Sequence, residues 1–198
     1  MASSEYSQKL ENVLEVGAKI ISQQGYERAT IRKVAKELNM SLAGLYYYIQ
    51  CKEELLYLIQ YNLFDSLVRS LRERLKETDD PEAGLYLMVE NHLSHFLNYE
   101  SQFKVCSQEL DSLTGEYYQK VYRKRREYFE LTLNLISEIK KRTGNGSLDP
   151  RLSTMCLFGA LNWFYMWYDP RKDVSAKRLS EEVANLFLNG FLPRGRAK

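Results

Sequence analysis

The apolar residues of this chain recur at the spacing of an α-helix almost from end to end, and this constrains the fold more than any other feature. Only four prolines interrupt the 198 residues, and no segment of useful length alternates apolar and polar residues as a strand would. A first helix with one apolar face is predicted to end at Gly25, a common helix stop. Longer helices are predicted near residues 52–76, 82–99, 101–112, 116–142, 150–168 and 176–191, with an acidic, proline-containing break at 78–84. The sequence therefore predicts an all-α fold.

Composition and charge exclude several classes of protein. Hydrophobic residues make up 44% of the chain and charged residues 27%, which is the balance of an ordinary globular protein and argues against disorder. The three cysteines have no CxxC spacing, so they fit neither a disulfide framework nor a zinc site, and a reducing compartment is expected. The N-terminus does not resemble a signal peptide, and the longest uncharged run, residues 152–168, is too short to span a membrane. We therefore expect a cytoplasmic protein with no membrane segment and no cofactor.

Two short helices joined by a tight turn are predicted directly after the first helix. Thr30 is placed to cap the helix that follows it, and Ser41 is placed to cap the next one, with Asn39 and Met40 making the turn. Short helix, tight turn and short helix within about 20 residues is the helix-turn-helix pattern. In that motif the second helix enters the major groove of DNA and its first residues approach the base edges.

Three consecutive tyrosines, residues 46–48, are predicted to lie on that second helix. Leu45 and Ile49 are four positions apart and should hold the helix on its core. Consecutive residues cannot share one face of a helix, so core filling does not account for all three tyrosines. The first two should point toward DNA, and the third should lie near the seam, partly packed. A tyrosine offers a ring to thymine methyls and sugars and a hydroxyl to phosphate.

The expected DNA contacts combine side chains with helix N-termini. Small residues at the start of the second helix would let the backbone approach DNA closely, and helix N-termini favour anions. Global charge gives little support, because seven basic and seven acidic side chains cancel within residues 1–55, so any attraction must be local. The predicted DNA-binding residues are Thr30, Ser41, Leu42, Ala43, Gly44, Tyr46, Tyr47 and Lys52.

Residues 10–56 resemble the DNA-binding domain of the TetR family of bacterial transcription regulators, and the match runs through the stretch ATIRKVAKELNMSLAGLYYYIQCKEELL, residues 29–56. The shared pattern comprises a helix-starting threonine, a Val-Ala core pair, a cap serine, a glycine before Leu-Tyr, and Lys-Glu after the tyrosines. The chain departs from the pattern at Leu42, where members often carry a basic residue, at Ala43-Gly44, and at Ile49, where many have phenylalanine. The resemblance implies a three-helix DNA-binding domain over residues 1–55 and a helical ligand-binding and dimerisation domain over residues 56–198.

The second half of the chain predicts a pocket for an apolar ligand. The segment LFGALNWFYMWYDP, residues 157–170, is apolar on several sides and is expected to be buried on several sides. Its part ALNWFYMWYDP, residues 160–170, resembles the C-terminal domains of family members that respond to fatty acyl-CoA or related CoA thioesters. The basic run at 122–127 could supply cations for a CoA phosphate, although such runs are more commonly solvated helix faces. The predicted pocket residues are Phe96, Tyr99, Phe103, Cys106, Tyr122, Arg126, Phe129, Asn162, Trp163, Met166 and Trp167.

The last two predicted helices are candidates for a dimer seam. They could instead complete the core of one chain, but a helix-turn-helix that binds two half-sites needs a two-fold axis, which favours the dimer. Small residues in the seam would allow close approach of the helices. The predicted interface residues are Gly159, Ala160, Phe164, Val183, Leu186, Phe187 and Gly190.

Other chemistries have weaker signals. His92 and His95, three positions apart, could hold a metal ion with Glu109 or Asp111, although a pocket-lining pair is more common. Cys106 could be a redox sensor or a small buried hydrophobe. We find no catalytic set of side chains, so the sequence predicts a protein that is not an enzyme. The predicted function is a ligand-responsive repressor that binds a palindromic double-stranded DNA operator as a homodimer; the alternatives are a helical carrier of hydrophobic ligands and a DNA-binding protein without an effector.

Overall fold

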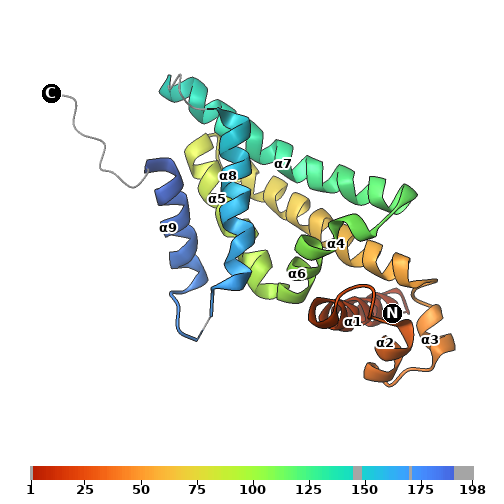
Figure 1. Cartoon of the computed structure of the whole chain (residues 1–198). Coiled ribbons are helices and arrows are strands. Elements are labelled where there is room, and N and C mark those ends of the chain that lie inside the picture. Colours follow the sequence, from red (N-terminus) through yellow and green to blue (C-terminus); the bar gives the residue numbers. More distant parts are fainter. Residues whose placement is uncertain (1, 145–148, 170, 190–198) are drawn as a thin grey trace. The chain divides into compact units, whose positions relative to one another are not determined.

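The computed structural model describes residues 2–144, 149–169 and 171–189, and all regular structure in these ranges is helical (Figure 1). This confirms the predicted all-α class. The chain divides into two compact units, one made of residues 1–66 and 99–125 and the other of residues 67–98 and 126–198. The range predicted to bind DNA lies in the first unit. Residues 99–125 belong to the same unit as this range, which the spacing of apolar residues in the sequence did not predict.

The first unit holds the three N-terminal helices, all of one further helix and parts of two others. They are α1 (Ala2–Gln24), α2 (Ile31–Glu37), α3 (Leu42–Tyr46), the start of α4 (Lys52–Arg74), α6 (Glu100–Gln108) and the start of α7 (Gly115–Thr143). The first helix ends before Gly25, whose φ of 82° is accessible to glycine without strain. Asn39 has a φ of 53°, which asparagine tolerates in tight turns. Both stops lie where the sequence predicted them.

One hydrophobic core holds the first unit together. Val34, Leu45 and Ile49 are at most 1% exposed and fasten the two short helices to α1 and α4. Val105 of α6 and Val121 of α7 belong to the same cluster, and α6 packs along α1 (Figure 1). Each such side chain contributes about 1.5–3 kcal/mol through burial. The position of the two short helices therefore depends on residues far along the chain.

The second unit contains the rest of α4 and α7 together with α5 (Pro81–Asn98), α8 (Pro150–Trp163) and α9 (Ala176–Asn189). Both α8 and α9 pack against α5 (Figure 1). Two predicted helices end differently from expectation. The one predicted over 101–112 closes with a short 3-10 turn, η2 (Leu110–Ser112), and the one predicted over 150–168 closes with another, η3 (Phe164–Met166). A third such turn, η1 (Leu75–Glu77), follows α4.

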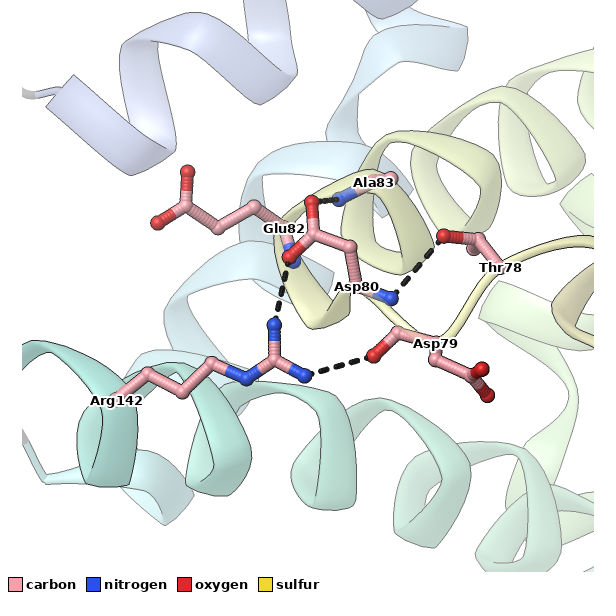
Figure 2. Close-up of polar contacts among 6 residues, drawn as sticks. All are labelled: Thr78, Asp79, Asp80, Glu82, Ala83 and Arg142. Carbon is pink, nitrogen blue, oxygen red and sulfur yellow. Dashed lines mark hydrogen bonds and ion pairs between the residues drawn. The ribbon is translucent and has the colours of Figure 1, made fainter.

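Arg142, in the last turn of α7, fixes the beginning of α5 (Figure 2). Its Nη1 lies 3.1 Å from Oδ1 of Asp80, and its Nη2 donates to the Asp79 carbonyl at 2.8 Å. The Asp80 carboxylate also accepts hydrogen bonds from the backbone N–H groups of Glu82, at 3.4 Å, and Ala83, at 3.2 Å. It therefore serves as the N-terminal cap of α5. The break predicted at 78–84 is an ordered helix start.

Candidate nucleic-acid interface

The two predicted caps define the starts of α2 and α3. Thr30 has an extended backbone, and its Oγ1 accepts a hydrogen bond from the Lys33 N–H at 3.2 Å. Ser41 does the same for the Gly44 N–H at 3.0 Å. Each cap is worth about 1 kcal/mol. A Cβ at Gly44 would lie 3.2 Å from the Ser41 Oγ, so the glycine leaves room for the second cap.

The three tyrosines lie at the end of α3 and in the turn that follows it. The expectation that all three lie on one helix is wrong, because α3 ends at Tyr46 and the Tyr48 N–H bonds to the Leu45 carbonyl three residues back, at 2.9 Å. That bond tightens the last turn. Tyr46 is 50% exposed and Tyr47 is 72% exposed, whereas Tyr48 is half-buried. The division into two outward tyrosines and one seam tyrosine is as predicted.

Tyr6, near the start of α1, completes a ring cluster with the last two tyrosines of the run. Its ring stacks on Tyr48 with centroids 5.1 Å apart and meets Tyr47 edge-on at 5.6 Å. Tyr47 and Tyr48 are themselves perpendicular, at 5.1 Å. The exposed Tyr47 ring is therefore held in a defined orientation. Sequence reasoning missed Tyr6, which lies in a polar segment upstream of the apolar face of its helix.

Lys52 begins α4 and faces the turn between α1 and α2. Its Nζ lies 4.2 Å from the centroid of the Tyr26 ring and donates to the Glu27 carbonyl at 3.1 Å. A cation over an aromatic face is attracted by the ring quadrupole. Burial, followed by the nearby Glu53 carboxylate, raises the pKa of Tyr26 to about 12, so the ring stays neutral. The ammonium group is oriented before any partner arrives.

A short basic segment lies beside these residues. Arg28, Arg32, Lys33 and Lys36 are all exposed, and no acidic residue interrupts residues 28–36. The Lys33 ammonium donates to the Gln24 side chain at 2.7 Å. The local surface is therefore more basic than the balanced charge of residues 1–55 suggests, which suits a phosphate backbone.

The predicted pocket residues divide between the two compact units. In the first unit, Phe103 and Cys106 of α6 are buried, whereas Tyr99 and Tyr122 are 44% and 40% exposed. Burial raises the pKa of the Cys106 thiol. Because the thiolate is the reactive form of cysteine, this environment suits a small hydrophobe better than a redox sensor.

In the second unit, Phe96 is buried and Phe129 is half-buried. Phe129 lies 5.9 Å from Phe158, a residue that the sequence analysis did not single out. The Phe158 ring is also 5.6 Å from Tyr128 and 5.9 Å from His92. The rings of Tyr128 and Phe129 of α7, Phe158 of α8 and His92 of α5 thus form one cluster inside this unit.

The histidine pair is buried on α5. The His95 Nδ1 lies 2.8 Å from the Asn91 carbonyl. Burial, together with the neighbouring His95, lowers the pKa of His92 to about 3, and burial also lowers the pKa of His95. Both rings are therefore neutral near pH 7. Over the described ranges, no three His, Cys, Asp or Glu side chains are grouped as metal ligands, so the metal alternative gains no support.

The outer side of α8 is an exposed apolar surface. Trp163, Met166 and Trp167, predicted to line the pocket, are 56%, 53% and 75% exposed, and Asn162 is exposed too. In the single chain, the described side chains of segment 157–170 are therefore not buried on several sides. This helix buries its inner residues against α5 and leaves the opposite side to solvent. We call that side the α8 stripe, defined by Leu152, Met155, Gly159, Trp163 and Met166.

The first four members of the α8 stripe follow one another at intervals of three or four residues, which places them on one side of α8. Met166 follows on η3. Leu152 is 60% exposed and Met155 is 53% exposed. A Cβ built at Gly159 meets no atom within 4 Å, and the neighbouring Ala160 is exposed as well. A contiguous exposed apolar surface of this kind marks an interaction site.

The remaining predicted interface residues lie on η3 and α9. Leu186 is 47% exposed, and Phe164, Val183 and Phe187 are half-buried. Gly190 lies outside the described residues. The inner side of α9 packs against α5, where the Tyr86 hydroxyl donates to the Asn185 side chain. This helix therefore has an inner side held by its own chain and an outer side open to a partner.

The basic run at 122–127 is only partly engaged in ion pairs. The Lys124 ammonium lies 2.8 Å from the Asp65 carboxylate, and Glu127 pairs with Arg72 at 2.7 Å. Arg126 is 3.4 Å from Glu130, but its side chain is 65% exposed. Its guanidinium group remains accessible to an anion.

Among the helices of the described part, none is long and apolar enough to cross a membrane.

Known proteins with similar sequences and structures are transcription regulators. The fatty acid metabolism regulator protein of Bacillus subtilis (strain 168) is 23% identical over 187 residues, covering 92% of this chain and 95% of the relative. The crystal structure of the TetR family regulator PfmR from Thermus thermophilus is 27% identical with a TM-score of 0.82, covering 91% and 98% of the two chains. AibR in complex with isovaleryl coenzyme A and operator DNA is 22% identical with a TM-score of 0.79, covering 89% and 96%.

Family profiles cover both halves of the chain. The profile of bacterial regulatory proteins of the tetR family matches residues 13–57, which contain the helix-turn-helix just described. The profile of the tetracyclin repressor-like C-terminal domain matches residues 78–191, more than half of the chain. The predicted helix-turn-helix and the predicted non-enzymatic class are thereby confirmed. This chain belongs to the TetR family of DNA-binding transcription regulators.

Proposed function

We propose that this protein is a ligand-responsive repressor, which binds a palindromic operator as a homodimer and releases it when a small apolar effector binds. We propose further that the effector is a fatty acyl-CoA or a related thioester, and that the protein acts in the cytoplasm. The observation that carries the proposal is the end of α3, where two exposed tyrosines stand beside two capped helix N-termini. The other residues supply anchoring, symmetry and the response to the effector.

The proposed contacts to DNA follow from the donors that the caps leave unused. The hydroxyl groups of Thr30 and Ser41 accept hydrogen bonds from their own helices, and each can still donate its proton to a phosphate oxygen. Leu42 is 37% exposed and suits a thymine methyl. Tyr46 and Tyr47 would contact bases and sugars, and the small residues between them and the cap would let the backbone approach. Lys52 would bind a phosphate.

The proposed homodimer would cover the α8 stripe and the outer side of α9. We assign Trp163, Met166 and Trp167 to this surface instead of the pocket, because their side chains are exposed in the single chain. Gly159, with open space where its Cβ would lie, would allow two copies of α8 to approach closely. Two-fold symmetry would place two copies of α3 for successive major grooves, about 34 Å apart.

The proposed effector class has support from the relatives and from the second unit. The Bacillus subtilis relative is a regulator of fatty acid metabolism, and AibR was solved with isovaleryl coenzyme A. The aromatic interior around Phe129 and Phe158 suits an acyl chain. The exposed guanidinium group of Arg126 suits a phosphate of the CoA moiety. Release from DNA requires that the effector bind the DNA-free state more tightly than the DNA-bound state.

Two measurements test the proposal. A duplex selected by the protein from random-sequence DNA should be a palindrome and should bind two chains. The Tyr47→Ala variant should bind this duplex much more weakly, while its thermal midpoint stays unchanged. Thermal unfolding with a series of acyl-CoAs should show a midpoint that rises with chain length, because a ligand of the folded state stabilises it by mass action. Free CoA is the control and should give no shift. No shift with any acyl-CoA would overturn the effector class and leave the DNA-binding proposal standing.

A further inference from the structure

Glu109, immediately after α6, connects three separate segments of the first unit. Its Oε1 accepts a hydrogen bond from the backbone N–H of Tyr26 at 2.9 Å, and its Oε2 accepts one from the Ser112 hydroxyl at 2.7 Å. Its carbonyl oxygen accepts one from the Gln60 side chain at 2.8 Å. Gln60 is fully buried on α4. A single residue thus joins the end of α6 to both the α1–α2 turn and α4.

The bond to Tyr26 satisfies a backbone group that the local chain leaves without an acceptor. Tyr26 follows Gly25, at which α1 has already stopped with a left-handed backbone. Past such a stop a backbone N–H often bonds back to a carbonyl of the last helical turn, but the Tyr26 N–H takes its acceptor from a distant segment. The Glu109 carboxylate supplies it across 83 positions of sequence, and a charged acceptor makes a stronger bond than a neutral one. The carboxylate therefore fixes where the Tyr26 backbone, and with it the ring, lies.

The Tyr26 ring in turn orients Lys52, the predicted phosphate-binding residue at the start of α4. The ammonium nitrogen lies 4.2 Å from the ring centroid, and one of its N–H groups donates a hydrogen bond to the Glu27 carbonyl. An ammonium group has three donors, so two remain for a phosphate. A side chain that is already oriented loses less freedom on binding than one that is not.

We propose that Glu109 is a positioning residue for operator binding, which acts by holding Tyr26 in the place where its ring orients the Lys52 ammonium. This inference rests on the proposed function, because it assumes that Lys52 binds a DNA phosphate. It assigns a role in DNA binding to a residue that lies far outside the helix-turn-helix in the sequence. The carboxylate itself does not touch DNA in this arrangement.

The test compares operator affinity over a range of salt concentrations for the full-length dimer and its variants, by fluorescence anisotropy with a duplex selected by the unmodified protein. Lys52→Ala should weaken binding by at least about tenfold and lower the salt slope by about two, because the homodimer loses one phosphate contact in each subunit. Glu109→Ala should produce a loss of the same kind. Once Lys52 is alanine, the second change Glu109→Ala should have little further effect, because coupled residues are not additive.

Three further variants separate positioning from general stability. Glu109→Gln keeps an oxygen that accepts from Tyr26 and should stay within about twofold of the unmodified affinity. Ser112→Ala removes only the bond to the other carboxylate oxygen and should also bind normally. Tyr26→Leu keeps the backbone bond to Glu109 and removes the ring, so it should reproduce the loss of affinity even where Glu109→Ala is poorly folded.

The inference is overturned by normal affinity and salt slope in Glu109→Ala and Tyr26→Leu, or by losses that add fully to that of Lys52→Ala. In either case the unmodified protein still binds its duplex, and the proposed function stands. Failure of the unmodified protein to bind any selected duplex overturns the proposed function itself, and this inference with it.

Discussion

At the scale of single residues, Tyr47 combines exposure with order. It is 72% exposed, yet its ring contacts both Tyr6 and Tyr48. A free tyrosine on a surface would lose side-chain freedom on meeting DNA, and that loss weakens binding. The ring cluster removes part of this loss in advance. We therefore propose that the N-terminal segment that carries Tyr6 supports the DNA-binding surface.

We expect Tyr6→Ala to weaken operator binding by roughly three- to tenfold, because one aromatic pair is worth about 0.5–1.5 kcal/mol. The thermal midpoint should fall by only a few degrees, since Tyr6 is partly exposed and lies outside the core cluster. Tyr6→Phe keeps the ring and is the matched control, with normal affinity expected. Anisotropy titrations of the three proteins on one duplex decide the matter. Equal weakening by both substitutions would assign the effect to the hydroxyl and contradict the role given to the ring.

His92 makes stability depend on pH. Its pKa in the folded protein is about 3, against about 6.5 in an unfolded chain. Between these values the unfolded chain binds a proton that the folded one does not, so the free energy of unfolding rises with pH across this window. Stability is fully present above pH 6.5 and is lost as the pH falls toward 3, by up to about 1.4 kcal/mol per pH unit. The lowered pKa of His95 acts in the same direction.

Urea unfolding at pH 7 and pH 5 measures this dependence. From the single group, we expect the free energy of unfolding to fall by about 2 kcal/mol between the two values. His92→Gln removes the titrating ring and should flatten the dependence, whatever it does to stability at pH 7. If the free energy of unfolding of His92→Gln falls between pH 7 and pH 5 as much as that of the unmodified protein, other groups control the acid stability.

At the scale of elements, local rules predicted more than packing rules did. The caps at Thr30 and Ser41 and the burial of Leu45 and Ile49 follow from spacing and side-chain chemistry within a few residues, and the structure has them. The place of α6 against α1 did not follow, because it depends on which apolar stripes meet in space. Segment 157–170 was expected to be buried because it is apolar on several sides, but composition does not distinguish the core of one chain from a surface that a second chain covers.

The capped junction at the start of α5 offers a test at this scale (Figure 2). Asp80→Ala removes the cap of α5 and the ion pair with Arg142, so it should lower the free energy of unfolding by about 1 to 1.5 kcal/mol. Arg142→Ala removes the pair but keeps the cap, and should lower it by no more than about 1 kcal/mol. Lys141→Ala, which loses only the exposed pair with Glu138, is the control. Chemical unfolding gives all three values. A larger loss in Arg142→Ala than in Asp80→Ala would contradict the order argued from the cap.

At the scale of the whole molecule, DNA binding and assembly depend on different surfaces of one chain. The helix-turn-helix was predictable because its pattern is short and its residues are neighbours in sequence. Tyr6 and Glu109 were not, because their roles arise only when distant segments meet. Regulators of this family bind operator DNA as dimers, and we propose that the exposed α8 stripe lies in the interface of that dimer. If so, a change in the stripe should impair DNA binding without touching the DNA-binding residues.

Gly159→Arg tests this link between the two surfaces. An arginine there meets no atom of its own chain near the Cβ position, so the fold should survive and the thermal midpoint should fall only as far as the lost dimer requires. In a dimer seam the same side chain would place a charge and added volume between two apposed helices. We expect a monomer by sedimentation at micromolar concentration and a loss of operator affinity of at least about a hundredfold, since each half-site then binds alone.

The matched control is Asn134→Arg, which adds the same charge at an exposed position of α7. It should leave both mass and affinity unchanged, and more basic charge could even strengthen DNA binding slightly. A Gly159→Arg protein that stays dimeric would show that the dimer interface does not include the α8 stripe. A monomeric Gly159→Arg protein that binds the operator as tightly as the unmodified one would break the argument from symmetry, because two half-sites would then be bound without a two-fold axis built into the protein.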